Sequence, residues 1–351
     1  MAYTTINKSK TYFNTVVWTG DDATGRSLTG FGFQPDLTWI KNTNDSSRYH
    51  VLVDAVRGSS KILYPNVEAS EGTDSNNVTS FNSDGITVGN DNNVNGGGNS
   101  IVSWNWKANG SGSANNDGAT ASTVSVNTTA GCSIVTWTGT GSATTIGHGL
   151  GTKPAMYIVR NRDTNSLNWR VYHHKNDTTN PAHKHLALES TQALGDASSV
   201  FNDTEPTNSV FSVGTDEGAN KSGSAMIAYC FAEKQGYSKF GKYVGNYNTN
   251  GTFIYTGFKP EFVIVKKRDG TGPWRMFDTV RAGNINPANK WLDANTESGG
   301  VNSTDVQGDL VSNGIKLRDA ANAFNTDGST YIYIAFGQSL IGSNDVPATA
   351  R

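Results

Sequence analysis

Short apolar segments rich in β-branched and aromatic residues alternate along the chain with segments rich in Gly, Asn, Asp and Ser. This alternation of strand-forming and turn-forming residues predicts an all-β fold. No segment shows the 3.6-residue period of an amphipathic helix flanked by capping residues. Three runs, at residues 37–41, 156–160 and 262–266, are largely apolar without alternation and end in a cation. We expect each of these runs to form a central strand that is covered on both faces.

Two sequence anchors recur three times along the chain. The first is an aromatic residue followed two positions later by Gly, and the second is a Gly three positions before a Pro. The Gly of the first anchor and the Pro of the second are 15 residues apart in every copy. The anchors are Trp18, Gly20 and Pro35; Trp137, Gly139 and Pro154; and Tyr243, Gly245 and Pro260. Equal spacing with matching residue types predicts an internal repeat. We expect a structural role for the anchors, with the Gly before each Pro permitting a turn.

The repeat is long enough for each copy to bury a core of its own. Successive anchor prolines are 119 and 106 residues apart, which is the size of a small domain. The sequence therefore predicts three tandem antiparallel β-sandwich repeats of a lectin-like kind. The expected divisions are repeat 1 at 1–112, a Gly/Ser/Asn/Thr-rich linker at 113–131, repeat 2 at 132–240, repeat 3 at 241–341 and a tail at 342–351. Within the linker, residues 124–126 have the composition of a short strand.

Composition and charge exclude several classes of partner. The formal net charge is −2 and only 17 % of residues are charged, so the basic footprint of a nucleic-acid binder is missing. The longest strongly apolar stretch, residues 225–232, is far below the roughly 20 residues that cross a bilayer. The first residues form no apolar leader, so export by a signal peptide is not expected.

The loops before the last strand of each copy differ most between copies, and we expect any ligand to bind there. They are rich in Asn, Asp and Gly, and amide and carboxylate groups can hold sugar hydroxyls beside an aromatic ring. The alternative is that they are solvated hairpin tips. The candidate ligand-binding residues are Asp91, Asn92, Asn93, Asn95, Asp216, Asn220, Asp319, Asn322, Asn325 and Asp327.

Metal and cysteine chemistry is only weakly indicated. His173, His183 and His185 lie close in sequence and are candidate metal ligands, with solvated loop histidines as the alternative. Residues 91–96 fit the start of a Ca²⁺ loop, but Val102 stands where an EF-hand needs a bidentate Glu, which leaves only a looser Ca²⁺ site. No other cofactor is expected. Cys132 and Cys230 form either a disulfide or two reduced thiols.

Two copies contain an Asp followed three residues later by an Arg. These pairs are Asp54 with Arg57 and Asp278 with Arg281, and the second copy has His173 and Asn176 instead. We expect a local ion pair that supports a loop, because chemistry shared by all copies would not be lost from one of them. No Ser/His/Asp or zinc-hydrolase signature is present, so a non-enzymatic protein is expected.

Several segments together resemble the structural, tail-fibre-like proteins of marine tailed bacteriophages, which contain a repeated β-rich domain of unassigned function. The segments are residues 1–6, 34–41, 104–108, 236–246 and 255–260, and the resemblance covers nearly the whole chain. It implies a virion protein, assembled in the host cytoplasm and in contact with other virion proteins, and it supplies no catalytic residues.

Within that resemblance, the expected function is a tail-fibre or tail-tip component that binds host-surface glycan or another receptor. A homo-oligomer is expected, because phage appendages are usually symmetric. A capsid decoration protein is the alternative, and a polysaccharide depolymerase is the third reading.

Overall fold

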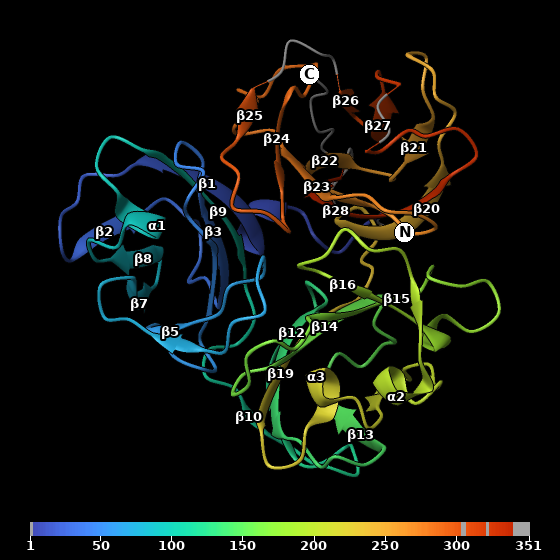
Figure 1. The fold of residues 1–351 in the computed structure, drawn as a ribbon. Helices are drawn as coiled ribbons and strands as arrows, with labels where there is room; N and C mark the ends of the chain where they lie inside the picture. Colours follow the sequence, from blue (N-terminus) through green and yellow to red (C-terminus); the bar gives the residue numbers. More distant parts are fainter. Residues whose placement is uncertain (1–2, 303–306, 321–322, 340–351) are drawn as a thin grey trace.

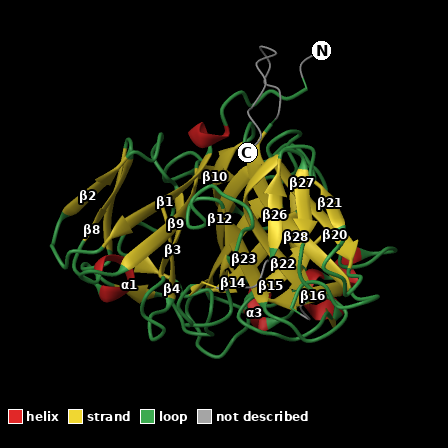
Figure 2. Cartoon of the chain, turned by 90° about the horizontal axis from the view of Figure 1, so that it is seen from above, coloured by secondary structure: helices red, strands yellow, loops and turns green. Residues whose placement is uncertain are grey.

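Strands account for nearly all regular structure in the computed structural model, which describes residues 3–302, 307–320 and 323–339. The named strands pair in an antiparallel manner, so the all-β antiparallel class is confirmed. The helices are single short turns at the edges of the molecule (Figure 2). They are η1 (Ser9–Thr11), α1 (Asn92–Asn95), η2 (Pro181–His183), α2 (Ser198–Phe201) and α3 (Glu217–Asn220).

The strands fall into three units along the chain. The first unit contains β1 (Phe13–Thr19), β2 (Arg26–Thr29), β3 (Leu37–Asn42), β4 (His50–Asp54), β5 (Lys61–Ile62), β6 (Gly72–Thr73), β7 (Val78–Asn82), β8 (Gly85–Val88) and β9 (Ser100–Trp106). The second contains β10 (Ser113–Asn115), β11 (Ser122–Asn127), β12 (Cys132–Thr138), β13 (Thr144–Gly147), β14 (Met156–Asn161), β15 (Arg170–His173), β16 (Lys184–Ala187), β17 (Gly195–Asp196), β18 (Val210–Val213) and β19 (Ala225–Phe231). The third contains β20 (Ser238–Val244), β21 (Phe253–Tyr255), β22 (Lys259–Lys267), β23 (Trp274–Asp278), β24 (Lys290–Asp293), β25 (Val301–Asn302), β26 (Gly308–Val311), β27 (Gly314–Leu317) and β28 (Thr330–Gln338).

The main sheet of each unit has the same strand order. In the third unit it is β20-β28-β22-β23-β24-β25, and the second unit contains the matching series β12-β19-β14-β15-β16-β17. The first unit has β1-β9-β3-β4, and the pairing of Leu52 with Leu63 continues this order into β5 and β6. A smaller sheet covers one face of each main sheet: β2-β8-β7, β13-β18 and β21-β27-β26. Figure 1 shows the units as three lobes around a common centre.

The central strands of the main sheets are buried along their whole length. Every residue of β3 and β14 is buried, and so is the matching part of β22 from Phe262 to Lys266. This confirms the prediction of doubly covered strands. One face packs on the unit's own small sheet, in clusters that contain Trp18, Trp137 and Tyr243 respectively. The other face enters a core that all three units share.

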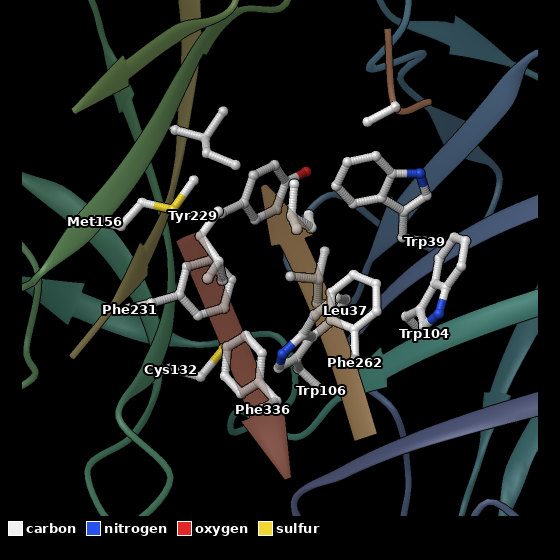
Figure 3. Close-up of a cluster of buried hydrophobic side chains, with 14 of the residues drawn as sticks. Leu37, Trp39, Trp104, Trp106, Cys132, Met156, Tyr229, Phe231, Phe262 and Phe336 are labelled. Carbon is white, nitrogen blue, oxygen red and sulfur yellow. The ribbon is translucent and has the colours of Figure 1, made fainter. Parts of the chain in front are cut away.

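The shared core is built around three aromatic rings from equivalent strands. Trp106, Phe231 and Phe336 stand at matching positions of β9, β19 and β28, each opposite the first apolar residue of the neighbouring central strand. Their ring centroids lie 5.6–5.9 Å apart in all three pairings. Figure 3 shows the three side chains together. A cavity of about 40 Å³ with an apolar lining lies beside them; apolar cavities of this kind stay dry, so it belongs to the core.

The repeat anchors have the structural roles expected of them. Gly32, Gly151 and Gly257, which precede the anchor prolines, have φ between 68° and 83°, which favours glycine. Pro35 and Pro154 lie two positions before the first residue of β3 and of β14, and Pro260 lies at an irregularity in the ladder of β22, so none has to donate a ladder hydrogen bond.

The predicted linker at 113–131 is wrong. Strand β10 pairs with β11, and β11 pairs with β12, so this segment extends the main sheet of the second unit. The polar composition misled because β10 is a mostly exposed edge strand and only half of the residues of β11 are buried. The predicted tail at 342–351 lies outside the described residues. The remaining divisions stay a prediction, although the shared core shows that they separate parts of one folded body.

Three buried cations connect the units in a closed ring. Lys41, Arg160 and Lys266 end the three central strands at equivalent positions, and all are fully buried. Each donates to a carbonyl oxygen of its own unit and to one of the preceding unit in the ring. The contacts between units are Lys41 Nζ to Glu297 O (2.9 Å), Arg160 Nη2 to Ala69 O (2.6 Å) and Lys266 Nζ to Thr191 O (3.0 Å). Burial lowers the pKa of Lys41 and of Lys266 to about 8.

Candidate ligand-binding cleft

The described candidate residues in the loops before the last strands serve mainly to hold those loops together. The carboxylates of Asp91 and Asp216 accept from backbone N–H groups at the starts of α1 and α3. Asp216 also pairs with Arg170 at 2.6 Å. Accepting a backbone N–H at the start of a helix is the usual structural role of an N-cap residue.

Three of the candidates are equivalent buried asparagines. Asn95, Asn220 and Asn325 have no exposed surface, and each amide bonds to the loop that follows the first anchor Gly of its unit. Asn220, for example, donates to Thr140 Oγ1 and to two backbone carbonyls, and accepts from Thr140 N. Their hydrogen-bonding groups are therefore already used inside the protein.

The other loop candidates are scattered. Asn93 accepts from the backbone of Tyr49, and Asp319 accepts from Gln307. Asn92 and Asp327 are exposed. Asn322 lies outside the described residues. The structure does not bring these side chains to one place, and their ligand-binding role stays a prediction.

The histidine candidates do not form a metal site. His173 is buried with its Nε2 3.3 Å from Tyr333 O, whereas His183 is half-exposed beside Asp203. The ring of His185 is largely covered, and burial lowers its pKa to about 4. Nowhere in the described ranges do three His, Cys, Asp or Glu side chains gather as metal ligands. The proposed histidine cluster is therefore wrong, because His173 is buried against the third unit whereas His183 is half-exposed beside Asp203.

Both cysteines are free and buried. Cys132 pairs with Phe231 across the sheet, which puts Cys230 one position out of register. Cys132 thus enters the shared core, while Cys230 enters the second unit's own core. Opposite faces of one sheet exclude a disulfide between them.

A polar cleft of about 500 Å³ opens between the third and first units, where β24 and β25 approach β1 and β9 (Figure 1). We call this boundary the third–first interface. Its polar lining is Thr43, Asn44, Ser100, Arg281 and Lys290. Its remaining lining is Val17, Val280, Gly300 and Val301. Among the described residues that line it there are two cations and no carboxylate.

Arg281 is the buried cation of this cleft and is only partly paired. Its side chain is 6 % exposed and its Nε donates to Asp278, as expected from the Asp-Arg spacing. Its guanidinium carbon lies 5.5 Å from the ring centre of Trp104 in the first unit. Nη2 is buried without a hydrogen-bond partner, and no described residue bonds to Nη1. An incompletely paired buried guanidinium is costly, which marks the site as one that an anion would stabilise.

The equivalent arginine of the first–second interface is fully paired. Arg57 Nε lies 2.5 Å from Asp54 Oδ2, and Nη2 donates to Leu52 O and to Tyr229 Oη. Nη1 lies 3.2 Å from a carboxylate oxygen of Glu71. Glu71 also pairs with Arg162 of the second unit at 2.8 Å. Burial raises the pKa of Glu71, but the two guanidinium groups outweigh burial and hold that pKa below its ordinary value.

Glu71, Leu194 and Gly300 are equivalent residues at the three interfaces. The N–H of each donates to the next unit's backbone, at Arg162 O (2.7 Å), Arg268 O (2.9 Å) and Thr43 O (2.7 Å) respectively. Strand pairing gives the same alignment, since Lys61 opposes Thr73 as Lys290 opposes Asn302. A carboxylate thus fills the first interface and an apolar side chain packed on the shared core fills the second. The third has no side chain at this position.

The Asp-Arg spacing identified Arg281 as half of an ion pair but did not show that its guanidinium is incompletely paired beside a cleft. The signal was available in principle, as the difference between Glu71 and Gly300. It was hidden because 14 residues separate Arg57 from Glu71 whereas 19 separate Arg281 from Gly300. Only the strand pairing shows that the two positions correspond.

The fold and the cleft thus define an all-β protein of three units closed around one core. The chain belongs to a family described as a domain of unknown function (DUF7483), whose model matches residues 8–339 as a single domain. A search of curated proteins found no significant match. No described helix has the length and apolar character needed to cross a membrane.

Proposed function

We propose that this chain is a non-enzymatic structural protein of a bacteriophage particle, displayed on the surface, that binds saccharide on the host cell. The observation that supports binding is the cleft of the third–first interface. Its hydroxyl, amide and cationic groups suit a polyhydroxylated ligand, and its valine side chains suit the C–H faces of a sugar ring. The virion assignment rests on the resemblance of the sequence to tail-fibre-like proteins.

The closed ring suits a rigid display scaffold. All three interfaces bury a cation with a hydrogen bond to the neighbouring unit, and the N-terminal segment also docks on the third unit. In that segment the Tyr3 hydroxyl donates to Gly257 O, and Ser9 N donates to Gln338 Oε1. A binding site placed on such a body keeps its geometry without ordering a loop.

The first test is immunogold electron microscopy of virions of the phage that encodes the chain, with antibody against the purified protein. Label at the tail or its tip is the expected result and supports receptor binding. Label spread over the head would replace this proposal with capsid decoration. Surface display would be contradicted if intact particles carry no label although the protein is detected once the same particles are disrupted.

Capsid decoration is the second candidate because of one observation. The described parts of the three units form a closed, approximately threefold ring, and such a body fits a threefold position on a shell (Figure 1). A depolymerase is tested by incubating purified protein with host polysaccharide. Release of new reducing ends would overturn the non-enzymatic proposal, and binding without release is expected.

Self-association of the chain also stays a proposal, checked by light scattering at micromolar concentration.

A further inference from the structure

The third–first interface lacks a carboxylate that its internal counterpart contains. At the first–second interface, Glu71 reaches the guanidinium of Arg57 through Nη1. At the third–first interface the residue in that place is Gly300, and the corresponding Arg281 Nη1 has no partner among the described residues. The Glu71 carboxylate thus shows which kind of group would complete the pairing of the Arg281 guanidinium.

The space for that group is open. A Cβ built on Gly300 would lie 3.9 Å from Arg281 Nη1, so this position faces the guanidinium directly. Gly300 itself lines the cleft of about 500 Å³, which is within the size range of small-ligand sites. A carboxylate that enters from solvent can therefore take the place that the Glu71 side chain occupies in the first–second interface.

The charge around the cleft favours an anion. Lys290 lines the cleft beside Arg281, and no described residue forms an ion pair or hydrogen bond with its ammonium group. Asp278 is fully buried and already holds Arg281 Nε, so it fixes the orientation of the guanidinium while the other edge faces the cleft. A guanidinium held in this way binds a carboxylate with strong, directional hydrogen bonds.

The rest of the lining suits a sugar. The Ser100 hydroxyl and the Asn44 amide nitrogen have no partner among the described residues, and such groups bond to sugar hydroxyls. Thr43 Oγ1 already donates to Ser100 O, and Asn44 Oδ1 already accepts from Ser100 N. Val17 and Val301 present partly exposed apolar surface, 38 % and 40 % respectively, on the same cleft.

We infer that the cleft between the third and first units binds a carboxylated saccharide, with the sugar carboxylate on Arg281 in the place that Glu71 takes on Arg57. This inference rests on the proposed saccharide-binding function and specifies its ligand class. It separates this interface from the other two, where Glu71 and Leu194 occupy the equivalent position.

The test uses the full chain and isothermal titration calorimetry with tetragalacturonate as probe. The matched probe is the same tetrasaccharide with its carboxyl groups reduced to alcohols. Wild type is expected to bind tetragalacturonate with a Kd of about 1 mM or tighter, and the reduced form at least about tenfold more weakly. Equal binding of the two probes would overturn the carboxylate assignment.

Gly300→Glu supplies an internal carboxylate and is the decisive variant. It is expected to weaken tetragalacturonate binding at least about tenfold while the protein stays folded, because the introduced carboxylate pairs with the Arg281 guanidinium and excludes the ligand carboxylate. Gly300→Ala is the control, since it adds only a Cβ that meets Thr43 Cβ at 3.3 Å; its binding is expected to stay within about twofold of wild type. Unchanged binding in Gly300→Glu would overturn the inference.

Two further measurements distinguish related outcomes. Lys290→Gln, a change outside the buried ion pair, is expected to weaken binding about threefold, and an unchanged Kd would remove Lys290 from the site. Acetate that binds the cleft as tightly as tetragalacturonate would overturn the saccharide assignment. If virions are labelled at the tail and tetragalacturonate fails to bind, only this inference falls. If tetragalacturonate binds at this cleft and virions lack the protein, only the virion assignment falls.

Discussion

The first–second and third–first interfaces have the same backbone contacts and different chemistry. In both, a buried arginine is oriented by an aspartate three residues earlier and faces an aromatic residue of the neighbouring unit, Tyr229 or Trp104. The first–second interface completes the guanidinium with Glu71, whereas the third–first interface has Gly300 and a cleft. The difference teaches that one side chain decides whether this repeated interface is filled or leaves an open cleft.

The second–third interface supports this reading. There the Asp-Arg pair is replaced by His173 and Asn176, and the facing strand has Ile334 in the position of Tyr229 and Trp104. Leu194 packs against the shared core at the position of Glu71. The Asp-Arg pair, the carboxylate and the facing aromatic residue are thus replaced together at that boundary, which is the pattern expected when a buried ion pair is replaced as a unit.

The largest expected effect comes from removing one of the three central rings of the shared core. Phe336→Ala removes a ring that contacts both Trp106 and Phe231, and is expected to lower the free energy of unfolding by about 4 kcal/mol. Urea denaturation checks this value. Phe253→Ala is the control on the same unit, because that ring is 45 % exposed. The loss in the free energy of unfolding from this control is expected to stay below about 1 kcal/mol. Equal losses would contradict a shared central core.

Glu71→Ala makes the first–second interface resemble the third–first interface. Arg57 loses one of its two carboxylate partners and Arg162 loses its contact with Glu71, so the free energy of unfolding is expected to fall by about 3 kcal/mol. Added acetate is expected to raise the melting temperature of this variant more than that of wild type, because the variant has a second incompletely paired guanidinium. The control is Glu205→Ala, whose exposed pair with Lys153 contributes about 0.5 kcal/mol or less. A fall no larger than that control would remove Glu71 from its assigned role.

A third prediction uses pH to probe the cations that close the ring. In wild type Lys41 has a pKa of about 8, against about 10.5 in the unfolded chain. The unfolded state therefore binds more protons between these values, so stability rises with pH in this window. The free energy of unfolding of wild type, relative to Lys41→Met, which has no titrating group at this position, is expected to rise by about 2 kcal/mol between pH 8 and pH 10. Thermal and urea unfolding across this range provide the comparison.

The equivalent comparison for Arg160→Met sharpens the contrast between interfaces. Burial lowers the pKa of Arg160 only to about 10. The difference in the free energy of unfolding between wild type and Arg160→Met is therefore expected to stay nearly constant up to pH 9. A Lys41→Met difference that is equally flat would show that Lys41 is not held in a dehydrated site.

The smallest expected effect is a gain. Gly300→Glu is expected to raise the free energy of unfolding by about 1 kcal/mol, because the new carboxylate pairs with Arg281 while Thr43 must shift slightly. Urea denaturation beside Gly300→Ala isolates the contribution of the carboxylate. A loss of stability relative to Gly300→Ala would show that Arg281 is not accessible from position 300.

The elements that depend on local composition were predictable. The central strands follow each anchor Pro because largely apolar, strand-favouring residues occupy both faces, and the turn glycines adopt the positive φ that their position requires. The buried ion pair of Asp54 and Arg57 was likewise evident from a spacing of three residues.

The arrangement of the units and the role of the loops were not predictable in this way. Which faces meet in the shared core depends on contacts between residues more than 100 positions apart, such as Trp106 with Phe231. The Asn-rich loops suggested ligand binding, but Asn95, Asn220 and Asn325 are buried, since one amide satisfies several backbone groups of a turn at once.

The central claim is that Arg281 binds a ligand carboxylate where Arg57 binds Glu71. A crystal structure of the full chain soaked with tetragalacturonate tests it most directly. We expect a carboxylate of the ligand within hydrogen-bond distance of Arg281 Nη1, between Gly300 and Lys290. A ligand bound elsewhere, or a cleft that stays without ligand while tetragalacturonate binds in solution, would contradict the account.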